Sequence, residues 1–123
     1  MIRVTRLGSP RARDEGLRLG TVRRPPRGVR KEDYARRDYY DSWLPELAPS
    51  ARLIRQAEKS WERFAKGYRR EMAAPAAAHL LELLARLSHH TDLSVGCYCE
   101  DETRCHRSIL RELLIEKGAK VAD

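Results

Sequence analysis

The sequence pattern of residues 93–122 restricts the fold classes that are possible for this chain. LSVGCYC (93–99) alternates between two faces as a strand does, and a short acidic turn leads from it into an amphipathic helix over about 104–117. Gly118 is a typical helix terminator, and AKVA (119–122) begins another strand. A strand–helix–strand crossover is right-handed and joins parallel strands. The chain is therefore predicted to be α/β.

Periodicity predicts the other strands. Residues 2–7 alternate and form a first strand, and LGTVRR (19–24) forms a second that ends at two prolines. Residues 25–42 have no sustained period and indicate a long surface loop with one helical turn. We expect a single α/β domain over residues 1–123, with a mainly parallel sheet of about three to five strands covered by helices.

Three helices precede the last strand. Ser50 and Ser60 are predicted to cap the first two, and the second helix, 60–73, carries one apolar stripe. Pro75 suits the first turn of the third helix, 75–88. In that helix we expect four leucines to face inward: Leu80, Leu83, Leu84 and Leu87.

The length and composition of the chain restrict the class of protein to which it can belong. A chain of 123 residues fits one domain, and no apolar run approaches the ~20 residues of a membrane span. The N-terminus lacks an apolar signal core, so we expect no secretion signal. Cys97, Cys99 and Cys105 are too few and too close for a disulfide framework. They indicate a thiol or metal site in a reducing, cytoplasmic setting.

Basic residues are concentrated near the N-terminus. Residues 1–37 contain twelve Lys and Arg but four Asp and Glu, within a chain of net charge +7. Such a segment attracts anionic metabolites or nucleic acid. The arginines are nevertheless spread through predicted loops and strands rather than along one helix face.

The predicted site is the loop 96–107, because parallel sheets bind ligands where a strand ends and a helix begins. At ~100° per residue, His106 shares a helical line with Leu110 and faces the sheet. Cys105 and Arg107 lie ~100° to either side of His106, at the edges of the buried stripe. Both can therefore border a crevice.

Four chemistries fit this loop. The first is anion binding by the helix N-terminus with Arg107 and Arg104. The second is catalysis by a Cys105 thiolate of depressed pKa, oriented or deprotonated by His106 and resolved, if oxidised, by Cys97 or Cys99.

The third is zinc bound by Cys97, Cys99, Cys105 and His106, although C-x-C-x5-C-H matches structural zinc sites poorly. The fourth is simple packing of small thiols around a core histidine. Some enzymes cradle an oxyanion with a cysteine and an arginine six positions later. Neither Cys97 nor Cys99 has this spacing, because the sixth position after them is Thr103 and Cys105 respectively.

Several motifs make the chain similar to a known family. They are RGV (27–29), WLPELAPS (43–50), the tryptophan helix SWERFAKGYRREMAAP (60–75) and SVGCYCEDETRCHRSIL (94–110). Together they resemble the YeaO-like bacterial proteins, domain-of-unknown-function family 488. The resemblance implies a compact α/β domain in a bacterial cytoplasm and no particular activity.

The resemblance also implies that the loop 24–30 lies near the loop 99–107. Arg23, Arg27 and Arg30 would then add positive charge around Cys105, and Arg27 joins the predicted anion ligands. Many relatives have D-R-L-W-P-R-G where this chain has VRRPPRG (22–28), so no acidic role is carried over.

Two functional hypotheses follow. The first is a small-anion pocket (phosphate, sulfate or carboxylate) at residues 96–107 with Cys105 thiol chemistry. The alternative is a nucleic-acid-associated module that uses the basic N-terminal third, with the Cys/His loop structural or zinc-binding. The alternative predicts an affinity for nucleic acid that falls steeply with salt and survives Cys105→Ser.

Overall fold

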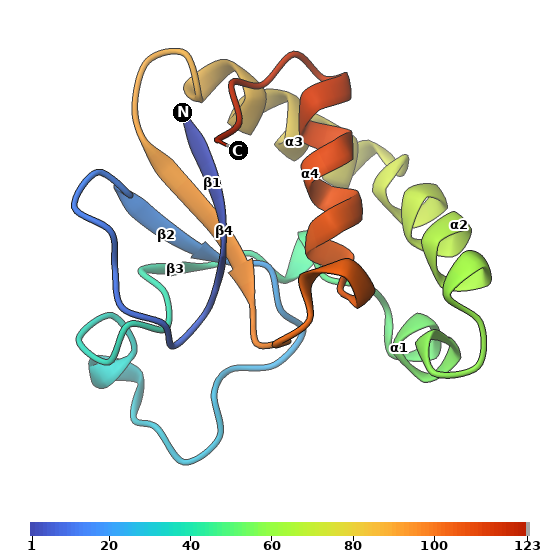
Figure 1. Ribbon diagram of the computed structural model, residues 1–123, viewed down its shortest axis with the longest axis horizontal. Coiled ribbons are helices and arrows are strands. Elements are labelled where there is room, and N and C mark those ends of the chain that lie inside the picture. Colours follow the sequence, from blue (N-terminus) through green and yellow to red (C-terminus); the bar gives the residue numbers. More distant parts are fainter. Residues whose placement is uncertain (123) are drawn as a thin grey trace.

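Four parallel strands form one sheet in the computed structural model, which describes residues 1–122 (Figure 1). Their order across the sheet is β1 (Ile2–Arg6), β4 (Leu93–Cys97), β2 (Leu17–Gly20) and β3 (Ser42–Trp43). Each neighbouring pair is parallel. The prediction of a small α/β domain with a parallel sheet is confirmed.

The chain after β4 forms the expected crossover. A 3-10 turn (Glu102–Arg104) precedes α4 (His106–Glu116), and Val121 then forms a parallel bridge with Ile2. The strand ends at Cys97, two residues earlier than predicted. The helix begins two residues later than predicted, because Cys105 has extended backbone angles, φ −125° and ψ 148°, between the 3-10 turn and α4.

The other helices begin where capping predicts. The Ser50 side chain accepts a hydrogen bond from the Leu53 N–H at the start of α1 (Ala51–Ala57). Ser60 caps α2 (Trp61–Met72) in the same way, and Pro75 begins α3 (Pro75–Leu87). Two further 3-10 turns lie at Lys31–Asp33 and Pro45–Leu47. Within residues 1–122, none of the helices combines the length and the apolar character needed to cross a membrane.

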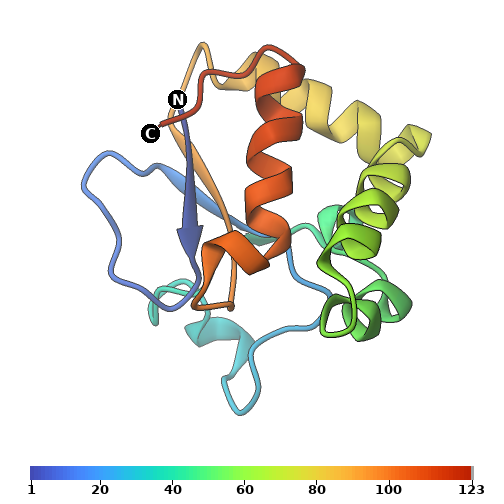
Figure 2. The ribbon, with the colours of Figure 1, turned by 45° about the vertical axis from the view of Figure 1, so that its right-hand side comes forward.

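The helices lie on one face of the sheet (Figures 1 and 2). Ile2, Leu19 and Val95 from the strands pack in one core with residues of all four helices, among them Tyr68 and Leu110. Burying this apolar surface is the main stabilising contribution to such a fold.

The opposite face of the sheet is covered by the loop between β1 and β2 and carries a buried ion pair. Arg18 on β2 is fully buried and pairs with Glu15, which also accepts a hydrogen bond from Ser94 on β4. The predicted second strand, 19–24, is confirmed at Leu19 and Gly20 only, since β2 begins two residues earlier and ends at Gly20. Arg18 can lie inside the fold at the start of this strand because Glu15 neutralises its charge.

The predicted inward face of α3 was also partly wrong. Leu84 is buried, but Leu83 and Leu87 are exposed, and the buried face is completed by Leu81 with two alanines, Ala77 and Ala85. The packed face of α3 therefore includes two small alanines, and the densest leucine stripe does not mark it.

Candidate functional site

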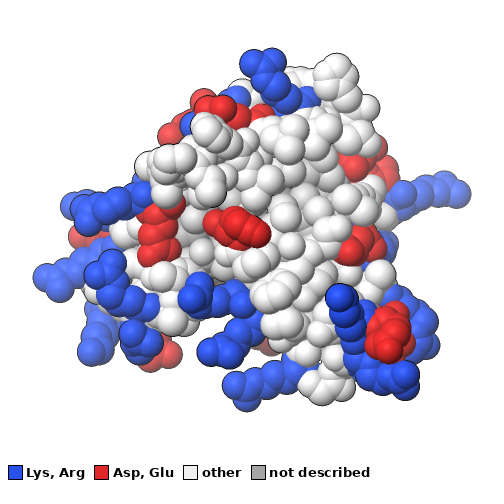
Figure 3. All heavy atoms as spheres, turned by 180° about the vertical axis from the view of Figure 1, so that it is seen from behind, with Lys and Arg blue, Asp and Glu red and all other residues white. Residues whose placement is uncertain are grey.

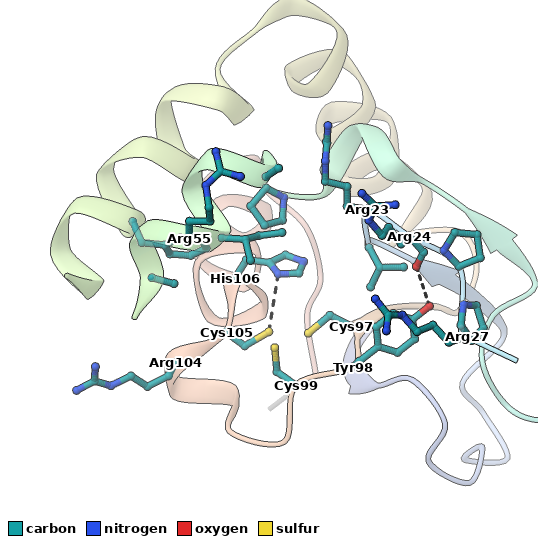
Figure 4. Close-up of a pocket in the computed structure, with 18 of the residues that line it drawn as sticks. Arg23, Arg24, Arg27, Arg55, Cys97, Tyr98, Cys99, Arg104, Cys105 and His106 are labelled. Carbon is teal, nitrogen blue, oxygen red and sulfur yellow. Dashed lines mark hydrogen bonds between the residues drawn. The ribbon is translucent and has the colours of Figure 1, made fainter. Parts of the chain in front are cut away.

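The three cysteines meet where β4 ends and α4 begins. Cys97 is the last residue of β4, Cys99 lies in the following turn and Cys105 directly precedes α4. Their sulfur atoms all lie within 4.8 Å of one another, and Figure 4 shows the three side chains converging. Cys97 and Cys105 are buried, whereas Cys99 is exposed. The predicted clustering of these residues is confirmed.

His106 lies beneath the sulfur cluster in a single tautomer. Its Nε2 lies 2.8 Å from the Thr21 carbonyl oxygen, which can only accept, so Nε2 carries the proton and donates it. Nδ1 is left as an acceptor facing the Cys105 sulfur at 3.8 Å. Burial lowers the pKa of His106 to about 4, so the ring is neutral at pH 7.

The pKa values of the three thiols are shifted in different directions. The pKa of Cys99 is lowered because the thiols of Cys105 and Cys97 hydrogen-bond to its sulfur and the positive charge of Arg107 lies close by. The pKa of Cys97 is raised by its contacts with the Cys105 and Cys99 thiols and by burial. The pKa of Cys105 is also raised: its contact with Cys97 lowers it, but donation to Cys99 and burial outweigh that contact. The lowered pKa thus falls on Cys99 rather than on Cys105, where sequence analysis expected it.

A cavity of about 970 Å³ opens over the sulfur cluster. It lies between the loop after β2, the helix α1 and the turn after β4, and its lining includes Cys97, Cys99, Cys105 and His106. The Tyr98 hydroxyl donates to the Arg24 carbonyl oxygen at 3.0 Å and so ties two of these segments together. The implied proximity of the loops 24–30 and 99–107 is confirmed.

The rim of the cavity is strongly basic. Five arginines line it and no acidic residue does: Arg23, Arg24, Arg27, Arg55 and Arg104. Within residues 1–122 none of the five forms an ion pair. Unpaired cations around a concave, largely apolar surface attract anions effectively.

The acidic residues next to the cysteines are directed elsewhere. Glu100 pairs with Arg6, and Glu102 pairs with Arg111. Asp101 accepts hydrogen bonds from the backbone and hydroxyl of Thr103. The acidic turn after β4 therefore leaves the cavity without negative side chains.

The predicted anion ligands occupy three different positions. Arg27 lies on the rim beside the loop after β2, and Arg104 lies on the opposite rim with its side chain directed away from the sulfurs (Figure 4). Arg107 is 4% exposed and donates to the Cys99 carbonyl oxygen at 2.7 Å. It holds the Cys99 backbone from behind, with its Nε lacking a hydrogen-bond partner, and is not part of the cavity wall.

Part of the arginine rim was not predicted from the sequence. Arg55 belongs to α1, and no pattern in the sequence indicates that this helix borders the end of the sheet. Arg24 was not singled out either, while Arg30 does not line the cavity and instead lies near Glu32. The rim depends on how loops and helices pack, so the sequence carries no direct signal for it.

The fold and the site together define a class: a small parallel α/β protein with a three-thiol cluster beneath an arginine-rimmed cavity. The chain belongs to the DUF488 family, since residues 2–118 match the family described as "Active DUF488-N3 subclade". The resemblance to family 488 is thereby confirmed. Searches of curated proteins and of solved structures gave no match.

Proposed function

We propose that this protein is a thiol-dependent enzyme that binds an anionic small molecule over Cys99 and attacks it with the Cys99 sulfur. The observation that carries the proposal is the position of Cys99. It is the exposed sulfur of the cluster, its pKa is lowered by the two buried thiols, and it lies at the base of a cavity lined by five arginines.

The buried groups have supporting roles in this proposal. The Cys99 sulfur donates an electron pair to an electrophilic carbon and forms a C–S bond. The electron pair displaced from that carbon moves to its substituent, which takes the proton of Cys105. His106 acts as a positioning residue, since its Nε2 donates to the Thr21 carbonyl oxygen and its Nδ1 lies 3.8 Å from the Cys105 sulfur. Arg107 fixes the backbone of the nucleophile. Catalysis by Cys105 itself stays a prediction from the sequence.

Alkylation kinetics test the proposal directly. Iodoacetate is an anion and iodoacetamide is its neutral counterpart, so the ratio of their rates measures attraction by the arginine rim. We expect that ratio to exceed the value for a free thiol about tenfold at low salt and to fall as salt is added. We also expect the rate to stay nearly constant between pH 8 and pH 6. An ordinary thiol with a pKa of about 8.5 slows roughly tenfold per pH unit.

Matched variants identify the groups responsible. Arg55→Ala should reduce the preference for iodoacetate, whereas Arg86→Ala, which removes an exposed arginine from α3, should not. Cys105→Ala removes a donor to Cys99 and should slow alkylation at pH 6 but not at pH 9. Mass spectrometry locates the label. Labelling elsewhere than Cys99, or an ordinary thiol pH profile, would refute the proposal.

A second candidate function is binding of a soft metal such as zinc. Sulfurs around tetrahedral zinc lie about 3.8 Å apart, given bonds of about 2.3 Å, and the three sulfurs here already lie within 4.8 Å. The lone pair of His106 Nδ1 adjoins them, and its other nitrogen is anchored to a carbonyl as in many metal-ligating histidines. Stoichiometric zinc after chelator-free purification, lost in Cys97→Ser, would support this candidate. Rapid alkylation of Cys99 that a chelator leaves unchanged would count against it.

A further inference from the structure

The cavity is too large for a bare inorganic anion. Its volume of about 970 Å³ is at the upper end of the roughly 300–1,000 Å³ that sites for organic ligands occupy. We infer that its ligand is a nucleotide, with the base against the apolar wall above the sulfurs and phosphates on the arginine rim. This inference rests on the proposed function for the chemistry at Cys99, but the binding itself does not require that chemistry.

The first support is the distribution of charge. Arg23, Arg24 and Arg27 lie on one side of the sulfur cluster, and Arg55 and Arg104 lie on the other (Figure 4). A ligand with one anionic group would use one side only. A nucleotide within a strand has a phosphate on either side of its base and can occupy both.

The second support is the chemistry of the wall. Apart from the arginines, cysteines and His106, the lining residues are apolar or tyrosine, and the lining contains no Ser, Thr, Asn or Gln. A sugar or another polyhydroxyl ligand would find few hydrogen-bonding side chains there. A flat aromatic base instead gains from stacking on apolar, aromatic and arginine surfaces. Ile54 faces this space and is 48% exposed, which a stacked ligand would cover.

The third support is the basic surface beyond the rim. In Figure 3 basic side chains predominate along the lower edge of the molecule, the same end at which Figure 1 shows the loop after β2 and α1. Exposed basic residues also occur on α1, α2 and their connection, namely Arg52, Lys59, Arg63 and Lys66, with two exposed acidic residues, Glu58 and Glu62, among them. Neighbouring phosphates of a single strand would meet these residues while one base enters the cavity.

Binding and protection experiments with a graded ligand set test the inference. The ligands are inorganic phosphate, ribose 5-phosphate, a nucleoside 5′-monophosphate, and a ten-nucleotide strand with and without its complement. Protection of Cys99 from iodoacetamide is measured in the wild-type protein, and direct binding is measured in Cys99→Ala. We expect the mononucleotide to protect at a concentration at least tenfold lower than ribose 5-phosphate, because stacking of the base contributes about that much.

Comparison of the ten-nucleotide single strand with the mononucleotide shows whether the ligand is a nucleotide within nucleic acid or a free nucleotide. Protection by the strand at a lower concentration than the mononucleotide, with less protection by the duplex, indicates a nucleotide within single-stranded nucleic acid. Equal protection indicates a free nucleotide. For either ligand, Arg27→Ala and Arg55→Ala should each weaken binding about fivefold, while Arg86→Ala should weaken it less than twofold.

Two results would overturn the inference. Equal protection by ribose 5-phosphate and the mononucleotide would show that no base is recognised. Equal losses of ligand affinity in Arg55→Ala and Arg86→Ala would show that overall charge alone attracts the ligand. Both results leave Cys99 reactivity untouched, whereas nucleotide binding to Cys99→Ala combined with an ordinary thiol pH profile in the wild type would refute the proposed chemistry alone.

Discussion

Replacing Glu15 by Gln should destabilise the fold severely although Glu15 lies on the face of the sheet opposite the helices. Its carboxylate accepts from Arg18 Nε at 2.5 Å and from Arg18 Nη2 at 2.9 Å, and it also accepts from Ser94 and the Ala12 N–H. Glutamine keeps the shape of the side chain but not its charge. The Arg18 guanidinium, which is fully buried, would lose its counter-charge.

The size of the stability loss in Glu15→Gln follows from the burial of Arg18. Removing one partner of a buried ion pair costs about 3–5 kcal/mol, because the remaining charge stays out of water. For a domain of this size that loss lowers the melting temperature by roughly 10–20 °C. Arg18→Met in the same chain removes the stranded charge, so the double variant should recover part of the loss. The recovery is incomplete because the Ser9 and Asp38 carbonyls lose their Arg18 donor.

Denaturant unfolding of the four proteins of this double-mutant cycle measures the coupling, with Asp14→Asn as the control. Asp14 pairs with Arg3 at 2.6 Å but is exposed, so its loss should change stability little. Alkylation of Cys99 in folded Glu15→Gln should match the wild type. If Glu15→Gln lowers the free energy of unfolding no more than Asp14→Asn does, the reasoning is refuted.

The same carboxylate predicts a pH dependence. Burial raises the pKa of Glu15, but hydrogen bonds from Arg18, the Ala12 N–H and Ser94 outweigh it and lower the pKa from 4.5 to about 2. A lowered folded-state pKa gives stability that is complete above pH 4.5 and is lost as pH falls toward 2. The loss amounts to about 3 kcal/mol. Unfolding between pH 6 and pH 2 should show this loss in the wild type and not in Glu15→Gln.

Two further substitutions test the packing next to the site. Gly20→Ala would place a Cβ 2.4 Å from the buried ring of Tyr40, so we expect a loss of about 1–3 kcal/mol in denaturant unfolding; an unchanged midpoint would show that the ring can move aside. Tyr68→Phe removes the donor to the Leu47 carbonyl oxygen at 2.7 Å and should cost about 1–3 kcal/mol in the same measurement. An effect near zero would mean that water replaces the hydroxyl.

The parallel sheet and the helix caps could be predicted because their signals are local. Ser50 and Ser60 each precede an apolar stripe, and the strand–helix–strand order of residues 93–122 permits one handedness. Arg18 and Leu83 could not be placed in this way. A buried arginine depends on Glu15 folding back over the sheet, and the packed face of α3 depends on how closely its alanines approach a neighbour.

The cysteine cluster was predictable for the same reason, since all three thiols flank one turn between a strand and a helix. The arginine rim was not, because Arg23 and Arg55 reach the cavity from a loop and a helix that are distant in sequence. Local patterns therefore located the cysteine cluster, while the arginine rim emerged only from tertiary packing.

The division of acidity within the cluster follows from backbone position rather than from residue type. Cys97 is held in a strand and Cys105 directly before a helix, so both sulfurs are enclosed by the core. Cys99 lies in the turn between these elements and remains exposed, with Arg107 bound to its carbonyl oxygen. Burial raises the pKa of Cys97 and Cys105, whereas the pKa of the exposed Cys99 is lowered by its contacts with the other two thiols. Moving the helix start to Arg104, as its sequence alone suggests, would have placed Cys105 within the first turn. The extended conformation of Cys105 therefore keeps this residue out of the first turn of α4.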